Sequence, residues 1–374
     1  MTFCTPDIER VTEILTRLVG FETITNGPNL DMIDWLQDFL TNAGFTVTRI
    51  PSPCGTKAGL LAKYGTGEGG VLYSAHSDVV PVAGQNWSGD PFALRPDGDR
   101  LIGRGTTDMK GFLACVLAHS ELLNASPSKQ PIMIALSWDE EIGCRGISHM
   151  IDQVILTLGR PDLVIVGEPT EMQLCVGHKG KAAYKAICTG EAGHSALAPQ
   201  FKNALHDAAK VIEALQEVQA DVAKNGPQDD AYDVAYSTIH AGKMTGGVAL
   251  NIVPEHAEID FEIRFLAADD PEDIMAQIAG KTPGGVRLEK QNSYPGFKAD
   301  PTSDACKRTV QLLDVKTPMK VGFGTEAGFF AALGLDTIVC GPGSMTKDGH
   351  QPDEGVAIEQ LKSCTRFVSQ LSNG

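Results

Sequence analysis

Histidine and acidic residues that could bind metal ions follow several short apolar segments of the sequence. His76 and Asp78 come directly after the apolar run Val71–Ala75, and Asp139–Glu141 comes directly after Pro131–Trp138. Histidine nitrogens and carboxylate oxygens are common ligands of zinc and related divalent ions. A carboxylate near a histidine can also orient the second ring nitrogen, as Asp78 could for His76. Taken singly, each group also fits a solvated loop after a strand.

Three further candidates lie far from these groups in the sequence. Asp108 lies in the glycine-rich segment Gly103–Gly111, directly before a helical run. Glycines let the backbone approach a ligand closely, but an aspartate at the start of a helix can also serve only as a cap. Glu168 ends another apolar run, and His350 follows a glycine-rich loop at 341–344. Each of these residues is ambiguous when it is considered alone.

Together, these residues could form a hydrolytic metal site. In an open α/β sheet, sites form at the carboxyl ends of the strands, so the groups can converge there. They would give each of two divalent ions one histidine and one carboxylate, with a shared aspartate as a bridge. Two ions about 3.5–4 Å apart can activate water and polarise a carbonyl group. Glu140 would point elsewhere and stay available as a general base. The candidate metal ligands are His76, Asp108, Glu141, Glu168 and His350.

The order of predicted elements supplies a sheet that could align these strand ends. Apolar stripes near residues 8–18 and 32–40 predict two helices before the first strand. Short apolar or alternating runs then predict strands at 45–50, 59–64, 71–75, 131–138 and 162–166, with helices at about 110–123 and 144–156. Such alternation is typical of a doubly wound α/β domain with a mostly parallel sheet and helices on both faces.

The pattern changes after Gly177 and returns after about residue 291. The intervening segment predicts strands at 181–189, 236–242, 255–265 and 286–290, with helices at 203–219 and 271–279. This β-α-β-β-α-β order is that of a ferredoxin-like α+β unit. A strand at 337–340 and a helix near 358–371 resume the earlier style. We therefore predict a catalytic domain formed by residues 1–176 and 291–374, interrupted by a smaller domain at 177–290.

Composition excludes several other classes of function. The 374 residues carry a formal net charge of −16, which argues against a general nucleic-acid binder. No apolar run approaches the ~20 residues of a membrane span, and the N-terminus does not resemble a signal peptide. The cysteines are scattered without a C-x-x-C pair, which predicts reduced thiols in a cytoplasmic protein. The segment Gly65–Gly70 matches G-x-G-x-x-G but precedes a strand, so we predict a hairpin loop and not a dinucleotide site.

The motifs resemble those of the M20 family of di-zinc amidohydrolases and exopeptidases. The matching segments follow the family's order along nearly the whole chain and are Ala75–Val82, Gly103–Gly111, Glu140–Gly143, Gly167–Thr170 and His350. Within the family, the segments Thr325–Ala327 and Gly349–Glu354 are most similar to those of the acetylornithine deacetylases.

The resemblance implies how the ligands divide between two ions, for which Zn²⁺ is the first choice and Co²⁺ the alternative. His76 and Glu168 would bind one ion, Glu141 and His350 would bind the other, and Asp108 would bridge them. Asp78 would support His76, and Glu140 would transfer a proton from the attacking water to the leaving amine. The Asp108–Met109 peptide bond is expected to be cis.

The resemblance also implies that the inserted domain is a lid and a dimerisation domain. His194 matches the family's lid histidine, which reaches the partner subunit's site and helps bind the oxyanion. Asn251 and Arg264 resemble polar substrate contacts, and the Arg264 guanidinium suits a substrate carboxylate. Without the resemblance, Arg264 would be interpreted as a strand-edge charge and His194 as a turn residue. A homodimer through this domain is expected.

The implied activity is hydrolysis of an N-acyl amino acid, namely N2-acetyl-L-ornithine to L-ornithine and acetate in arginine biosynthesis. Alternatives within the family are a succinyl-diaminopimelate desuccinylase, an aminoacylase and a dipeptidase. An alternative of another class is a non-catalytic metal-binding relative. Because the segment Gly324–Ala327 resembles a site loop, we predict that Glu326 lies near the ammonium side chain of the substrate.

Overall fold

The computed structural model describes residues 5–313 and 317–372, and the chain forms two compact units. The first unit contains Met1–Gly177, Ala299–Met319 and Thr325–Gly374, and the inserted unit contains His178–Lys298 and Lys320–Gly324. The inserted unit extends beyond residue 290 because its last long strand, β12 (Arg287–Tyr294), is longer than the strand expected at 286–290.

A sheet with a parallel centre organises the first unit. Its strands lie in the order β1 (Thr46–Pro51), β2 (Ala58–Tyr64), β6 (Ile132–Ser137), β3 (Val71–His76), β7 (Leu163–Val166), β15 (Thr337–Val339) and β8 (Cys175–His178). The pairs β3–β6, β3–β7 and β7–β15 are parallel, whereas β1–β2, β2–β6 and β15–β8 are antiparallel. The carboxyl ends of β3, β6, β7 and β15 therefore meet at one edge. The hairpin predicted at Gly65–Gly70 is wrong, because β6 lies between β2 and β3.

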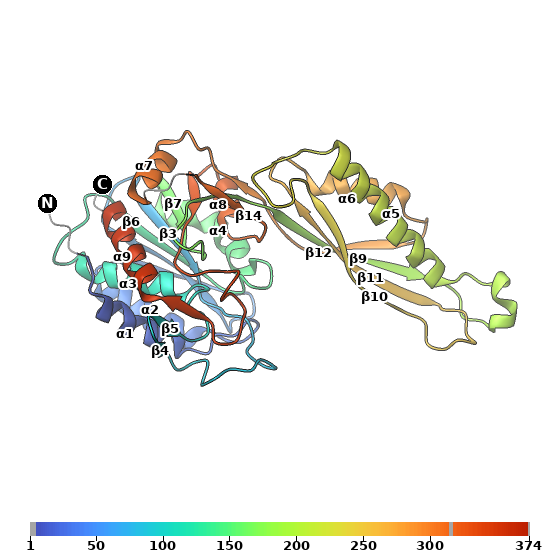
Figure 1. Ribbon diagram of the computed structural model, residues 1–374, viewed down its shortest axis with the longest axis horizontal. Helices are drawn as coiled ribbons and strands as arrows, with labels where there is room; N and C mark the ends of the chain where they lie inside the picture. Colours follow the sequence, from blue (N-terminus) through green and yellow to red (C-terminus); the bar gives the residue numbers. More distant parts are fainter. Residues whose placement is uncertain (1–4, 314–316, 373–374) are drawn as a thin grey trace. The chain divides into compact units, whose positions relative to one another are not determined.

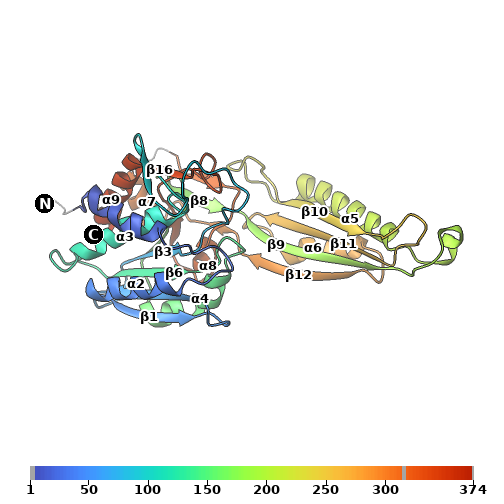
Figure 2. The ribbon, with the colours of Figure 1, turned by 90° about the horizontal axis from the view of Figure 1, so that it is seen from below.

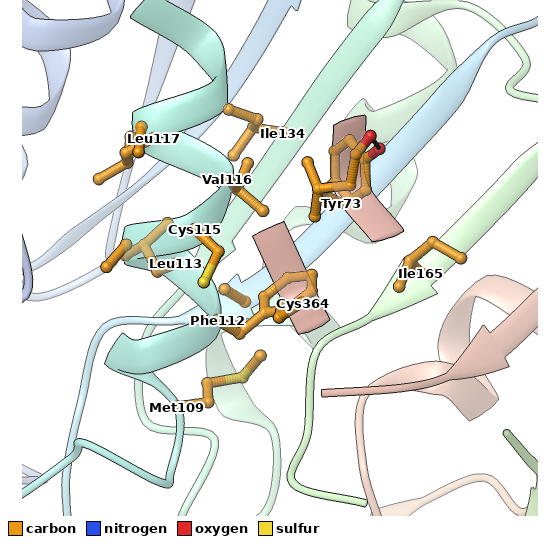
Figure 3. Close-up of a cluster of buried hydrophobic side chains, with 14 of the residues drawn as sticks. Tyr73, Met109, Phe112, Leu113, Cys115, Val116, Leu117, Ile134, Ile165 and Cys364 are labelled. Atoms are coloured by element: carbon orange, nitrogen blue, oxygen red, sulfur yellow. Dashed lines mark hydrogen bonds between the residues drawn. The ribbon is translucent and has the colours of Figure 1, made fainter. Parts of the chain in front are cut away.

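Helices cover both faces of this sheet (Figures 1 and 2). On one face, apolar side chains of the sheet form a single cluster with α1 (Ile8–Val19), α2 (Leu30–Asn42), α3 (Lys110–Leu122) and α9 (Ile358–Ser372). Figure 3 shows Phe112 and Val116 of α3 in this cluster with Tyr73 of β3 and Ile134 of β6.

The other face of the sheet packs against a second set of helices. Along a strand, successive side chains point to opposite faces, and Leu72 and Met133 are buried outside the cluster that contains their neighbours Tyr73 and Ile134. Here α4 (Arg145–Leu158) contacts β2 and β6, and α8 (Ala327–Ala332) contacts β15. The remaining helix, α7 (Asp304–Leu313), contacts α9. These layers confirm the predicted doubly wound α/β domain.

A small second sheet brings two distant loops of the first unit together. Its strands are β4 (Arg95–Asp97), β5 (Arg100–Ile102) and β16 (Gly355–Ala357), and β16 pairs with β5 so that Gly355 lies opposite Ile102. The pairing places the end of the loop that carries His350 beside the start of the loop that carries Asp108. These three strands have three residues each, and none of them was predicted from the sequence.

The inserted unit has the predicted β-α-β-β-α-β order (Figure 2). Its elements are β9 (Gly180–Thr189), α5 (Ala204–Asn225), β10 (Thr238–Gly246), β11 (His256–Phe265), α6 (Pro271–Lys281) and β12, with a 3₁₀ helix, η1, at Ser195–Gln200. The antiparallel sheet has the order β10-β11-β9-β12. Alternate residues of β9 and β11 are buried and pack with α5 and α6 in one cluster.

Two short strands, β13 (Phe297–Lys298) and β14 (Met319–Val321), occur where the chain passes from one unit to the other. None of the helices in the described ranges is long and apolar enough to cross a membrane.

Candidate metal centre

The elements of the first unit place all five predicted metal ligands at the carboxyl edge of its parallel strands. His76 is the last residue of β3, and Glu141 and Glu168 lie in the loops that follow β6 and β7. Asp108 lies two residues before α3, and His350 lies in the long loop between β15 and β16. The sheet therefore collects residues that are up to 274 positions apart (350 − 76) in the sequence.

Asp108 joins these residues into two groups through its two carboxylate oxygens. Its Oδ1 lies 3.0 Å from His76 Nε2, and the same nitrogen lies 3.7 Å from Glu168 Oε1. Its Oδ2 lies 3.4 Å from His350 Nε2, which lies 2.9 Å from Glu141 Oε2. Within each group, the candidate ligand atoms all lie within 4.8 Å of one another. This arrangement suits two cations that share one carboxylate.

Two orphaned oxygens indicate that the residues fit bound cations. Among the described residues, Glu141 Oε1 and Glu168 Oε1 are buried and have no hydrogen-bond partner. A buried carboxylate oxygen without a partner is costly, and buried charges are normally paired or bound to metal. Divalent cations in the two groups would satisfy both oxygens, and imidazole with carboxylate suits zinc or cobalt.

Protons can balance part of this negative charge when no cation is bound. Burial, with the nearby Asp108 carboxylate, raises the pKa of Glu141 to about 7 and that of Glu168 well above its usual range. Hydrogen bonds to Asp108 and Glu141 raise the pKa of His350 to about 10. Burial lowers the pKa of His76, but its hydrogen bonds to Asp108 and Asp78 outweigh that effect, so the pKa lies well above the ordinary value.

Glu140 lies beside Glu141 but belongs to neither ligand group. Its Oε1 accepts a hydrogen bond from the Cys144 thiol at 3.3 Å. Burial, together with the negative charges of Glu141 and Asp108, raises the pKa of Glu140 well above its usual range. A carboxyl group with a raised pKa beside the ligands has the character of a proton-transfer group.

Asp78 connects the two halves of the centre in a way that was only partly expected. The His76 ring donates from Nδ1 to the backbone oxygen of Asp78 at 2.9 Å, which leaves Nε2 for a cation. The Asp78 carboxylate lies 3.5 Å from Nδ1 and accepts hydrogen bonds from the backbone N–H groups of Glu140 and Glu141 at 3.1 and 3.3 Å. Asp78 thus supports His76 through its backbone and the Glu140–Glu141 loop through its side chain.

Asp139 forms an ion pair with a buried lysine side chain. Asp139, Glu140 and Glu141 are consecutive carboxylates, which repel one another when they are ionised and no cation is near. In the structure, the Lys57 ammonium lies 2.6 Å from Asp139 Oδ1, and Lys57 and Asp139 are 5% and 6% exposed. The conflict therefore concerns only the other two carboxylates. Sequence reasoning missed this pair because Lys57 directly precedes β2 and is separated from Asp139 by 82 positions in the sequence.

The local backbone at Asp108 excludes the capping alternative. Helix α3 begins at Lys110 with Met109 as its N-cap, and no side chain makes the capping hydrogen bond. The Asp108–Met109 peptide bond is cis, as the resemblance implied. The Asp108 carboxylate faces the two histidines instead of the helix.

Glu326 lies in an environment that differs from the one predicted. The residue is 1% exposed, and its two carboxylate oxygens accept hydrogen bonds from the hydroxyls of Ser74 on β3 and Ser137 on β6. Burial raises its pKa to about 7. These contacts favour a role in joining the two strands over the predicted contact with a substrate ammonium group.

The other three predicted site residues lie in the inserted unit. His194 and Asn251 are exposed on adjoining segments, because the backbone N–H of Ser195 donates to the Asn251 carbonyl at 3.1 Å. His194 Nδ1 accepts from the Ala196 N–H at 3.1 Å, so in the neutral ring Nε2 carries the proton. Arg264 on β11 donates to Glu262 at 2.8 Å and to the Tyr294 hydroxyl at 2.9 Å. The substrate roles of all three stay predictions.

Comparison with known proteins gives a family and a fold. Residues 72–373 match the model of peptidase family M20/M25/M40. The aminopeptidase PepT from Bacillus cereus is similar over 98% of each chain, with a TM-score of 0.78 and 19% identity. An M20 family metallo-carboxypeptidase from Sulfolobus solfataricus is similar over 96% of this chain and 98% of its own, with a TM-score of 0.79 and 18% identity. A dinuclear metal-binding M20 peptidase from Bacillus subtilis has a TM-score of 0.67 and 14% identity, over 98% of this chain and 97% of its own.

The raised pKa values predict that metal binding releases protons. At about pH 7 the metal-free chain carries a proton on His350, whose pKa is about 10, and on roughly half of the Glu141 side chains, whose pKa is about 7. These protons must leave before the side chains can bind a cation, so the apparent affinity for Zn²⁺ should rise from about pH 6 to about pH 8. Calorimetric titrations in buffers of different ionisation enthalpy measure the protons released. An affinity that stays constant over this range, with no proton release, would contradict the electrostatics of the site.

Proposed function

We propose, because the chain belongs to peptidase family M20/M25/M40, that this metal-dependent hydrolase cleaves the amide bond of an N-acyl amino acid, and N2-acetyl-L-ornithine in particular. The observation that carries the proposal is the shared carboxylate of Asp108, with one oxygen toward each ligand group, and Glu140 directly precedes the candidate ligand Glu141. A non-catalytic relative would have no need to keep Glu140 together with all five candidate ligands.

The proposed chemistry assigns a distinct task to each group of residues. Two divalent ions, Zn²⁺ in the first place, would activate a water molecule and polarise the substrate carbonyl when bound. His76 and Glu168 would hold one ion, Glu141 and His350 the other, and Asp108 both. The Asp78 contacts to His76 and to the Glu140–Glu141 backbone would fix these ligands relative to one another.

Glu140 is proposed as the proton carrier. One carboxylate oxygen accepts a hydrogen bond from the Cys144 thiol. The carboxylate would accept a proton from water and transfer it to the leaving amine. Nearby cations favour the ionised form of a carboxyl group, so bound metal would lower the raised pKa of Glu140 toward the value that a base needs near neutral pH.

Residues of the inserted unit are proposed to bind the substrate. His194 would donate from Nε2 to the carbonyl oxygen as it gains charge, a task for which its tautomer is suited. The Arg264 guanidinium would bind the substrate carboxylate, and Asn251 would add a polar contact. Glu262 and Tyr294 hold the Arg264 side chain in one orientation, which reduces the entropy lost when a substrate binds.

The acyl group is the least constrained part of the proposal. The acetyl preference rests on the segments Thr325–Ala327 and Gly349–Glu354, which are similar to those of acetylornithine deacetylases. Peptide cleavage is the second candidate, because the family is a peptidase family and similar structures are an aminopeptidase and a carboxypeptidase. A desuccinylase acting on succinyl-diaminopimelate and an aminoacylase are further alternatives.

Acetate release from N2-acetyl-L-ornithine tests the proposal directly. Purified protein should release acetate, lose this activity to a chelator and regain it with Zn²⁺ or Co²⁺. A panel of succinyl-diaminopimelate, N-acetylmethionine and a dipeptide, at equal concentration, separates the alternatives. Faster turnover of another panel member by folded, metal-loaded protein would replace the proposed substrate, and no turnover of any member would favour the non-catalytic relative.

An exposed edge of the inserted unit supports the proposed homodimer. β10 is an edge strand of the four-stranded sheet, and most of its residues are exposed. Met244 on this strand is 45% exposed, and Val248 and Leu250 in the loop that follows are 86% and 101% exposed. Exposed strand edges with apolar side chains are favourable surfaces for pairing with another chain. We propose that a second copy covers this surface and that His194 acts in the partner's site.

Mixing two inactive variants tests this arrangement. Glu140→Ala should lose turnover while it still binds two ions, because it removes a proton carrier and no ligand, and His194→Ala should lose oxyanion stabilisation. If His194 acts across a two-fold dimer, mixed dimers contain one intact site, so unfolding and refolding the two together should restore about a quarter of wild-type activity. Each variant refolded alone is the control. A mixture that forms dimers but stays inactive would place His194 in the site of its own chain, and a His194→Ala variant that is active alone would place His194 outside any site.

A further inference from the structure

Glu354 is a buried carboxylate that the proposed chemistry does not use. It is 1% exposed and lies four residues after His350. Oε1 accepts hydrogen bonds from the backbone N–H groups of Thr107 and Asp108 at 2.9 and 3.0 Å, and Oε2 accepts one from the N–H of Gly105 at 3.0 Å. One side chain therefore binds three amides of the loop that ends at the shared ligand Asp108.

A second set of contacts extends from Glu354 to the backbone of His350. Arg104, which is 1% exposed, donates from Nη1 to Glu354 Oε2 at 2.7 Å and from Nη2 to Gln85 Oε1 at 2.5 Å. Gln85 then donates from Nε2 to the His350 carbonyl oxygen at 2.8 Å. The Trp87 ring lies against the Arg104 guanidinium, 4.9 Å from the ring centre, and its Nε1 donates to Gln85 at 3.0 Å.

The position of His350 shows why such a network is needed. Its side chain is 49% exposed, and its backbone has a φ of +61°, a conformation that residues other than glycine seldom adopt. His76 is the last residue of a buried strand and is 1% exposed, whereas His350 lies in a loop. Packing alone therefore fixes His350 much less than it fixes His76.

We propose that Glu354, Arg104 and Gln85 form a positioning network that sets the distance between Asp108 and His350 and so tunes the affinity of the ion bound by Asp108, Glu141 and His350. The inference rests on the proposed two-ion function and deepens it. The three residues act through the backbone of the ligands and are not ligands or catalytic residues themselves. The ion bound by His76 and Glu168 shares Asp108, but its other two ligands lie at the ends of β3 and β7, which these three side chains do not contact through any hydrogen bond or ion pair found among the described residues.

Titration of the metal-free protein with Zn²⁺ tests this inference. Gln85→Leu removes the contact with His350 at a partly exposed position, and Glu354→Gln weakens the contacts with the Asp108 loop at a buried one. Gln85→Leu should weaken one of two binding steps by about 10- to 100-fold, the usual effect of losing a residue that supports a ligand. His350→Ala identifies that step, because it removes a ligand of the same ion. Glu354→Gln should weaken the same step, with a smaller effect on the other step because both ions share Asp108. At saturating Zn²⁺, Gln85→Leu should recover most of the wild-type kcat.

Asp353→Asn is the matched control. Asp353 lies in the same loop but binds Arg95 and Ser88 instead of a ligand loop, so both Zn²⁺ affinities should stay within about twofold of wild type. If Gln85→Leu binds Zn²⁺ with both wild-type affinities, or if it weakens both binding steps equally, the inference is overturned. This result can be obtained even if Glu354→Gln fails to fold. Wild-type protein that binds no Zn²⁺ would instead contradict the proposed function and, with it, this inference.

Discussion

Much of the first unit serves to hold closely spaced negative charges around Asp108. Asp108 and Glu168 are each 3% exposed, and Glu140 and Glu141 lie beside them. Carboxylates that are buried close together raise each other's pKa values, and their burial costs free energy unless cations or protons compensate the charge. The two histidines supply part of this compensation, and the remaining orphaned oxygens of Glu141 and Glu168 match a centre built to hold two cations. An α/β sheet satisfies the geometry because the ends of its parallel strands meet along one edge.

Hydrogen bonds from backbone amides to buried carboxylates hold the loops that carry the candidate ligands. Asp78 binds the amides of Glu140 and Glu141, and Glu354 binds the amides of the Asp108 loop. In both cases a carboxylate that is not itself a candidate ligand accepts two or more N–H groups from a loop that carries one. Such hydrogen bonds fix the backbone before any cation arrives, so little ordering remains to be done when it binds. The Lys57–Asp139 pair holds the start of the Glu140–Glu141 loop in the same manner, with an ammonium group in place of amides.

The sequence predicted the strands and the candidate ligands because both leave local signals. A strand such as β3 is a continuous apolar run, and His76 follows that run directly. The signal failed where a partner is distant in the chain. Neither Lys57 for Asp139 nor Glu354 for the amides at 105–108 has a local pattern that points to its partner. Glu326 was predicted from a segment that resembles a site loop, and nothing in the sequence indicates that Ser74 and Ser137 bind its carboxylate. Its substrate role stays a prediction. The short strands β5 and β16, which join the Asp108 and His350 loops, have no periodicity long enough to read.

Anomalous diffraction from crystals of the Zn²⁺-loaded protein would show whether Asp108 bridges two cations. We expect two zinc peaks about 3.5–4 Å apart, one on each side of the Asp108 carboxylate. One peak should lie beside His76 and Glu168, and the other beside Glu141 and His350. A single fully occupied peak that binds ligands of both groups, or peaks that leave Asp108 uncoordinated, would contradict this bridging role.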